Sequence, residues 1–167
     1  MGLLQPHGRR GGEVRRAGLS AAERFIVVHS LGHARAALEA AASLGVRVTL
    51  ASAPGAGIYA GPGWFKAVVE MARGELPAAE FSCVLDCGGA AGMVLAALRQ
   101  GLRRVRFDGP AATADRLADI AVQCGAVIER APLGPTLDLL DHDDPETACR
   151  AFLAALPPAR ASDIPPP

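Results

Sequence analysis

Three side chains that could transfer protons stand at the ends of short apolar runs. His29, Asp86 and Asp108 each lie at or directly after such a run. Imidazole and carboxylate groups serve most often as general acids and bases, and histidine titrates near neutral pH. If the runs are strands of a parallel sheet with the order 2-1-3-4-5, the first and third strands are neighbours. We therefore expect His29 and Asp86 to form an acid–base pair that Asp108 joins from the fourth strand.

The three residues also have a purely structural interpretation. A histidine at a strand end can satisfy a local hydrogen bond, and an aspartate there can cap a turn or a helix. In parallel α/β folds, however, ligands bind beyond the carboxyl ends of the strands. The shared position of these polar side chains therefore predicts a functional site at that edge of the sheet.

Glycine-rich segments lie at the same edge. Segments 52–63 and 86–92 follow the second and third apolar runs. Glycine lets a ligand approach backbone N–H groups and helix N-termini, which attract anions. The alternative is that tight strand-to-helix turns need glycine anyway. We predict a small anionic metabolite as the ligand, with a phosphorylated compound favoured. The glycines expected to bind it or a cofactor are Gly55, Gly57, Gly88, Gly89 and Gly92.

Two segments resemble the dinucleotide-binding fingerprint of Rossmann proteins. Residues 55–60 read Gly-Ala-Gly-Ile-Tyr-Ala, but Pro-Gly at 62–63 interrupts the place where the helix of that family already runs. Residues 87–92 read Cys-Gly-Gly-Ala-Ala-Gly, with Cys87 in place of the first glycine. Asp108 follows about 20 residues later, at the spacing of the ribose-binding acid. The resemblance implies dinucleotide binding, whereas the other features of the sequence designate no cofactor.

Cysteine usage indicates a reducing compartment. The four cysteines form no C-x-x-C pair, so we expect free thiols and a cytoplasmic location. Cys87 follows a strand and precedes a helix, where it is either a nucleophile of lowered pKa or a small buried thiol. His29, His33, Asp86 and Cys87 lack the spacing of a zinc site, and no metal is predicted.

Composition limits the classes of partner. The chain has 167 residues, half of them hydrophobic, with 17 basic and 17 acidic residues. This balance argues against nucleic acid, which requires a basic excess or a basic face. No apolar run approaches the roughly 20 residues of a membrane-spanning helix, so we expect no membrane partner. A small-molecule ligand is the expected partner, and a homo-oligomer is compatible with the sequence.

Apolar runs alternate with segments of helical period. This alternation predicts βαβ crossovers and a five-stranded parallel sheet with helices on both faces, doubly wound and flavodoxin- or Rossmann-like. A half (β/α) barrel would have almost the same pattern and is the alternative. Residues 137–140 are expected to form a short strand or a turn. The expected strands are 25–28, 46–50, 83–85, 105–107 and 126–128, and the expected helices are 34–43, 64–73, 93–100, 114–123 and 145–156.

Domain limits and one long loop complete the prediction. Residues 1–22 are expected to form a flexible Arg-rich arm, 23–158 a single α/β domain and 159–167 a disordered Pro-rich tail. The aromatic Gly/Pro-rich loop 52–66 is longer than a βα turn requires, so it could be a lid or a contact surface. An enzyme using acid–base catalysis and a non-catalytic protein-interaction domain using loop 52–66 are both compatible with these features.

Overall fold

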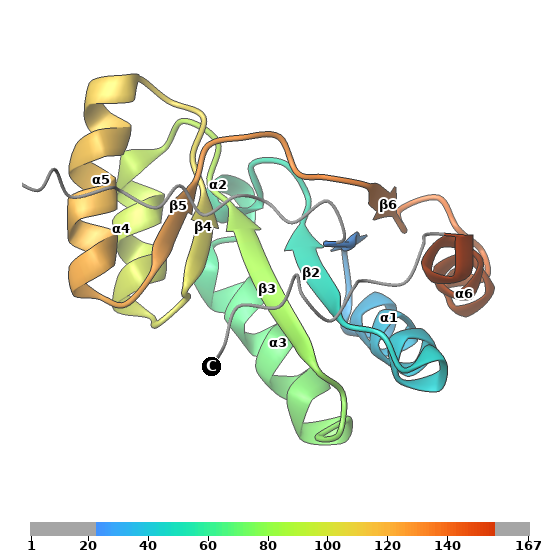
Figure 1. The fold of residues 1–167 in the computed structure, drawn as a ribbon. Coiled ribbons are helices and arrows are strands. Elements are labelled where there is room, and N and C mark those ends of the chain that lie inside the picture. Colours follow the sequence, from blue (N-terminus) through green and yellow to red (C-terminus); the bar gives the residue numbers. More distant parts are fainter. Residues whose placement is uncertain (1–22, 156–167) are drawn as a thin grey trace, which may run out of the picture.

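The computed structural model describes residues 23–155, which contain six strands and six helices (Figure 1). The predicted arm 1–22 and tail 159–167 lie outside the described residues. The strands are β1 (Phe25–Val28), β2 (Val48–Ser52), β3 (Phe81–Asp86), β4 (Arg104–Arg106), β5 (Val127–Glu129) and β6 (Thr136–Asp138). The helices are α1 (Leu31–Leu44), α2 (Ala56–Tyr59), α3 (Pro62–Glu75), α4 (Ala91–Arg99), α5 (Ala111–Gln123) and α6 (Pro145–Ala155).

All six strands belong to one parallel sheet with the order β5-β4-β3-β2-β1-β6. The predicted α/β fold with a parallel sheet is confirmed, with six strands rather than five. The additional strand is β6, which falls in the weakly patterned region after the fifth strand. It pairs with β1, where Ile26 lies opposite Leu137.

The strand order differs from the predicted 2-1-3-4-5. Strands β1 to β5 follow one another in sequence, so β2 separates β1 from β3. Parallel crossovers are right-handed, and a chain that always adds strands on the same side therefore leaves its helices on one face. This sequential order is the one expected of a half-barrel, and the doubly wound arrangement is not found.

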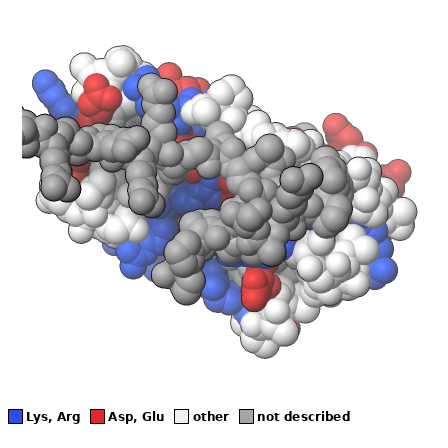
Figure 2. Space-filling view, in the orientation of Figure 1, with Lys and Arg blue, Asp and Glu red and all other residues white. Residues whose placement is uncertain are grey.

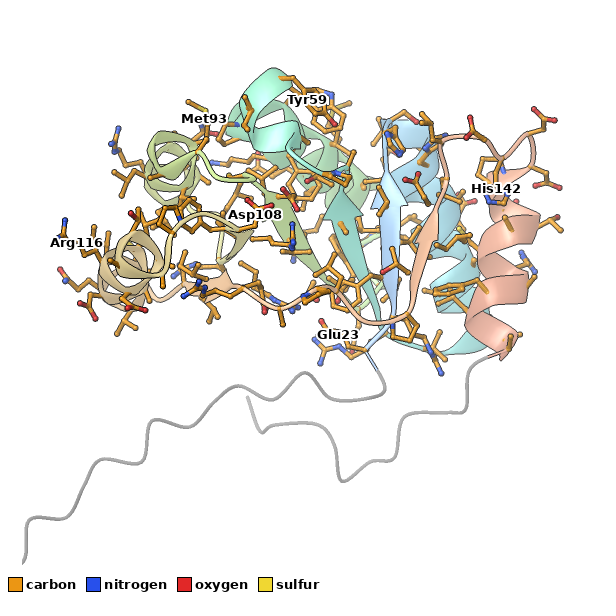
Figure 3. All side chains as sticks on the ribbon, turned by 90° about the horizontal axis from the view of Figure 1, so that it is seen from above. Glu23, Tyr59, Met93, Asp108, Arg116 and His142 are labelled. Carbon is orange, nitrogen blue, oxygen red and sulfur yellow. The ribbon has the colours of Figure 1, made fainter. Side chains whose placement is uncertain are left out.

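The core is asymmetric about the sheet. Ile26, Leu50, Leu85 and Val105 point to the helical side and form one large cluster with buried residues of α1, α3, α4, α5 and α6. Residues of opposite orientation form a second, small cluster without helical residues: Phe25, Val27, Ala51, Ala53 and Val84. Leu133, in the link from β5 to β6, packs against this second cluster. Figure 3 shows that link passing on the side of the sheet away from α2 and α4.

Local signals explain the helix boundaries near the site. Ser30 caps α1 through its side chain, and Gly45 ends the helix in the left-handed conformation at φ 63°. The predicted loop 52–66 is only partly a loop, because it contains the single turn α2 and the start of α3. Pro62 opens α3 at a position where proline is favoured, since its missing N–H needs no partner there.

Aromatic residues of this region have different roles. Phe65 is completely buried in the main core, and Trp64 packs partly buried against it, as expected of residues that anchor a helix on a sheet. Tyr59 of α2 is exposed. None of the helices in residues 23–155 combines the length and the apolar character needed to cross a membrane.

Candidate functional site

A histidine–aspartate pair stands at the carboxyl ends of β1 and β6. Nε2 of His29 lies 2.6 Å from Oδ1 of Asp138, and the same oxygen accepts a hydrogen bond from the backbone N–H of Leu140 at 2.9 Å. The His29 side chain is 19% exposed and that of Asp138 is 51% exposed. The imidazole is therefore fixed through one nitrogen while solvent still reaches the pair.

The first turn of α1 places a second imidazole beside this pair. Ser30 accepts a hydrogen bond from the backbone N–H of His33 at 3.1 Å, and Nδ1 of His33 accepts one from the backbone N–H of His29 at 3.3 Å. The two rings meet edge to face with centroids 5.9 Å apart. Burial lowers the pKa of His33, and the neighbouring His29 lowers it further, while Asp138 raises it. The net direction favours a neutral His33 near pH 7.

Asp86 cross-links three segments of the edge. Its Oδ1 accepts hydrogen bonds from the backbone N–H groups of Gly55 and Gly88, each at 2.8 Å. Its Oδ2 lies 2.5 Å from Nη1 of Arg106, and its backbone N–H donates to the hydroxyl of Ser52 at 2.9 Å. Only 7% of the residue is exposed. Asp86 thus has the geometry of a structural group that joins the turns after β2 and β3 to β4.

Arg106 connects Asp86 to the exposed Asp108. The Nη1 atom of Arg106 that binds Asp86 is also 3.8 Å from Oδ2 of Asp108. Asp108 is anchored through its backbone N–H, which donates to the carbonyl oxygen of Gly88 at 3.1 Å. Its side chain is 52% exposed. The structure therefore joins Asp86 and Asp108 in one cluster.

His29 does not belong to that cluster, and its predicted contact with Asp86 is absent. The prediction placed β1 beside β3, but β2 lies between them. The carboxyl ends of β1 and β3 are therefore two strand spacings, or about 10 Å, apart. Asp138 takes the place of Asp86 as the partner of His29, because β6 adds to the free edge of β1.

Sequence reasoning missed Asp138 and Arg106. Asp138 lies inside the segment 137–140 that was expected to form a short strand or a turn, and the observed strand of three residues ends at it. The rule that selected Asp86 did not select Asp138, because that segment was expected to continue to Leu140. Arg106 alternates with the buried Val105 along β4, a period-two pattern that directs it to the face opposite the helices.

Three of the five glycines selected from the sequence have structural roles. Gly55 and Gly88 adopt positive φ angles of 70° and 49°, which side chains disfavour, and both donate to Asp86. A Cβ on Gly57 would lie 2.6 Å from Sγ of Cys87 and 3.1 Å from the carbonyl oxygen of Asp86. This glycine lets α2 pack directly on the end of β3.

Gly89 and Gly92 stand in more open surroundings. A Cβ on Gly89 would approach Oδ1 of Asp108 to only 3.8 Å, and one on Gly92 would meet nothing within 4 Å. Ala90 precedes α4 without a side-chain cap. At this turn the Asp86 carboxylate accepts the Gly88 N–H, and the Asp108 carboxylate stands beside Gly89, where the fingerprint would place a pyrophosphate.

Cys87 lacks the character of an activated nucleophile. It is completely buried, and burial together with the charge of Asp86 raises the pKa of its thiol to about 12. All four cysteines are free. Over residues 23–155, no group of three or more His, Cys, Asp or Glu side chains is arranged to hold a metal ion.

Comparison with known proteins assigns the chain to no family. No model of a known protein family matches the chain, and no curated protein matches its sequence. The functional argument therefore rests on two groups at one edge of the sheet, the pair of His29 with Asp138 and the cluster of Asp86, Arg106 and Asp108.

Proposed function

We propose that the carboxyl edge of the sheet binds a small anionic metabolite and that His29 transfers a proton to or from it. The observation that supports this most strongly is the 2.6 Å contact between His29 and Asp138 at the ends of adjacent strands. An aspartate that accepts the Nε2 proton holds the ring in one tautomer and leaves Nδ1 as the basic nitrogen. Asp138 is thus the positioning residue, and His29 is the acid–base group.

The start of α1 is the most favourable place for the anionic group of the metabolite. Its first turn contains no acidic residue, and Gly32 adds no side chain there. The positive end of the helix and the imidazoles of His29 and His33 therefore face the same region. Around β3 and β4 two carboxylates, those of Asp86 and Asp108, share the one guanidinium of Arg106. At the start of α1 the carboxylate of Asp138 is paired with His29.

Asp108 of the second cluster lies beyond β4, three strand spacings or about 14 Å from His29, so this cluster suits the uncharged far end of an extended ligand. The Asp108 carboxylate is exposed, and it can accept hydrogen bonds from hydroxyl groups. Open backbone at Gly89 and Gly92 would let such groups approach. The ligand class that combines these requirements is an extended polyhydroxylated compound with one phosphate or carboxylate. Free thiols, including the exposed Cys124, suit a cytoplasmic setting for this function.

A thermal-shift screen tests the proposal directly. Wild-type protein is screened against sugar phosphates, hydroxy acids and inorganic phosphate, because a ligand that binds only the folded state raises Tm. A compound that stabilises the wild type should lose most of its effect with His29→Gln or Asp138→Asn. Asp143→Asn, at an exposed position outside the pair, is the matched control. Full retention of the shift in both variants of the pair would exclude this site.

A non-catalytic interaction domain is the second candidate, and one observation favours it. Ile58 and Tyr59, adjacent on α2, are 57% and 69% exposed. Exposed aromatic and aliphatic side chains are common anchors of protein contacts. If this pair mediates a homo-oligomer, light scattering should detect a dimer that Tyr59→Ser converts to a monomer. A wild-type monomer at high concentration would remove the support for self-association.

A further inference from the structure

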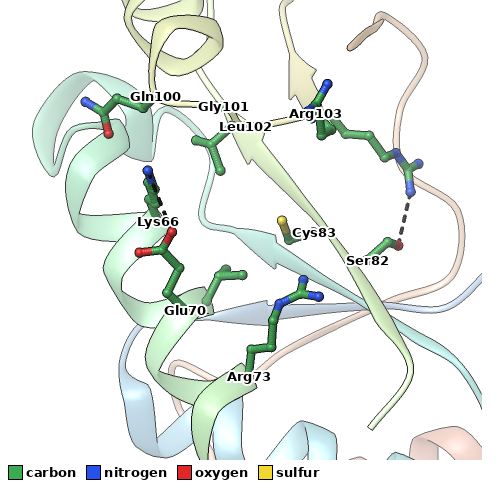
Figure 4. Close-up of a pocket in the computed structure, with 11 residues that line it drawn as sticks. Lys66, Glu70, Arg73, Ser82, Cys83, Gln100, Gly101, Leu102 and Arg103 are labelled. Carbon is green, nitrogen blue, oxygen red and sulfur yellow. Dashed lines mark hydrogen bonds and ion pairs between the residues drawn. The ribbon is translucent and has the colours of Figure 1, made fainter. Parts of the chain in front are cut away.

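A pocket separate from the carboxyl edge lies between α3, the first half of β3 and the turn that leads from α4 into β4 (Figure 4). Its volume is about 300 Å³, enough for a small organic molecule. None of the residues assigned to the site above lines it. Its wall includes Lys66, Val69, Arg73, Cys83, Leu102 and Arg103.

The rim of this pocket has an excess of positive charge. Four basic residues and a single acidic one line it: Lys66, Arg73, Arg103, Arg104 and Glu70. Glu70 lies 3.6 Å from Lys66, and two glutamates outside the pocket compensate Arg104. Figure 2 shows basic side chains gathered at the lower left of the molecule, over the region where α3 approaches β4 in Figure 1.

Two of the arginines are engaged with uncharged groups. The guanidinium of Arg73 lies over the ring of Phe81, 4.6 Å from its centroid. Nη1 of Arg103 donates to the backbone carbonyl oxygen of Cys124 at 2.7 Å. The Arg103 guanidinium is thereby held on a carbonyl outside the pocket lining. No carboxylate of residues 23–155 pairs with Arg73, so an anion in the pocket would meet the Arg73 guanidinium without first displacing a carboxylate.

The floor of the pocket is apolar. Val69 and Leu102 are buried, and Figure 4 shows the thiol of Cys83 lying between Leu102 and Arg73. Burial raises the pKa of the Cys83 thiol, and the nearby Arg73 and Arg104 lower it only in part. The thiol is therefore neutral near pH 7, and it contributes a small apolar surface beside a cation.

We propose that this pocket binds an organic monoanion with an apolar body, such as a medium-chain alkanoate. The carboxylate pairs with the guanidinium of Arg73, and the hydrocarbon chain lies against Val69, Leu102 and Cys83. Inorganic phosphate matches the rim but leaves the apolar floor in contact with water, and a neutral alcohol matches only the floor. The joint requirement for charge and apolar surface selects the amphipathic anion. This site is independent of the proton-transfer proposal at His29.

Calorimetric titration of the full chain with octanoate, 1-octanol and octylammonium tests the selectivity. Octanoate should bind saturably, about two- to fivefold more tightly than either analogue, because Arg73 is exposed and an exposed ion pair contributes up to about 1 kcal/mol. Arg73→Gln should weaken octanoate by about the same factor. Arg116→Gln, on the exposed surface of α5, should leave it unchanged. Absent octanoate binding, equal binding of octanol, or an unaffected Arg73→Gln variant would overturn the proposal.

Thiol protection locates the bound molecule. Iodoacetamide labelling followed by site-resolved mass spectrometry should show that saturating octanoate slows modification of Cys83. The exposed Cys124, which does not line the pocket, is the internal control and should react at an unchanged rate. Saturable octanoate binding that leaves the rate at Cys83 unchanged would place the molecule elsewhere and would also refute the assignment.

Discussion

Nε2 of His29 lies 2.6 Å from Oδ1 of Asp138, although 109 positions separate the two residues in the chain. Their meeting depends on β6 pairing with β1 in parallel register. The contact predicts a defined tautomer, in which neutral His29 has its proton on Nε2. Long-range ¹H–¹⁵N NMR correlation spectra of the imidazole should show this form in the wild type and a mixture in Asp138→Ala. A proton on Nδ1 in the wild type would contradict the assigned roles.

Asp86 should matter more for stability than for ligand binding. Asp86→Asn replaces an oxygen facing Arg106 by an amide that cannot accept its hydrogen bond, in a nearly buried setting. We expect a loss of about 2 kcal/mol in the free energy of unfolding, measured with urea. Asp108→Asn, at a half-exposed side chain, should cost less than about 1 kcal/mol. Equal effects of the two substitutions would show that Asp86 is not the cross-link described.

Two glycines at the same edge should respond oppositely to alanine. Gly57→Ala forces a Cβ to 2.6 Å from Sγ of Cys87, and we expect a loss of about 1–3 kcal/mol from overpacking. Cys87→Ala removes that sulfur and should recover part of the loss in the double variant. Gly92→Ala, within α4 and in open space, should be neutral or should stabilise by up to about 1 kcal/mol. Urea unfolding of the four variants provides the comparison.

The buried thiols should make stability fall at alkaline pH. Burial raises the pKa of Cys87 and of Cys149 to about 12, from an ordinary value of 9.0. The folded state therefore holds these protons more tightly than the unfolded state. This contribution to stability is complete below pH 9 and is lost as the pH rises towards 12. Unfolding experiments across this range should show a weaker pH dependence in Cys87→Ala and Cys149→Ala. An unchanged slope in both variants would refute the assignment.

Native-state labelling gives an independent check on the same thiols. Cys124 is exposed and should react with iodoacetamide at pH 8 first, whereas Cys87 and Cys149 are buried and should react only after unfolding. Quantitative peptide mass spectrometry measures all three rates in one sample. Rapid labelling of Cys87 in the folded protein would restore the nucleophile interpretation that its burial opposes.

The secondary structure was largely predictable from the sequence, whereas the strand order was not. Gly45 marks the end of α1 through its own backbone conformation, so local reasoning finds it. The prediction began this helix at 34 and missed the cap Ser30, because glycine and histidine follow that cap in the first turn. The strand order depends on whether each new strand joins the same edge of the growing sheet or the opposite edge. That choice depends in turn on which faces of the sheet become buried. The distribution of apolar residues over both faces of β1, with Phe25 and Ile26 both buried, is compatible with either choice.

The candidate site was predictable in position but not in pairing. His29 and Asp138 lie at strand ends, as ligand-binding groups of parallel sheets do. Their contact depends on a non-local strand pair, which no spacing in the sequence reveals. Asp86 was selected for its position, yet its oxygens are occupied by two backbone N–H groups and Arg106. That both carboxylate oxygens of Asp86 already have partners becomes visible only when the turns after β2 and β3 are placed side by side.

The sequential strand order also affects how the protein is made. Each of β2 to β5 can pair with the strand synthesised just before it, so most of the sheet can assemble while the chain emerges from the ribosome. The outer edge of β1 is different, because its partner β6 is translated about a hundred residues later. During that interval the edge is open to pairing with other nascent chains. The step that closes this edge also brings Asp138 to His29, so protection from aggregation and assembly of the dyad coincide.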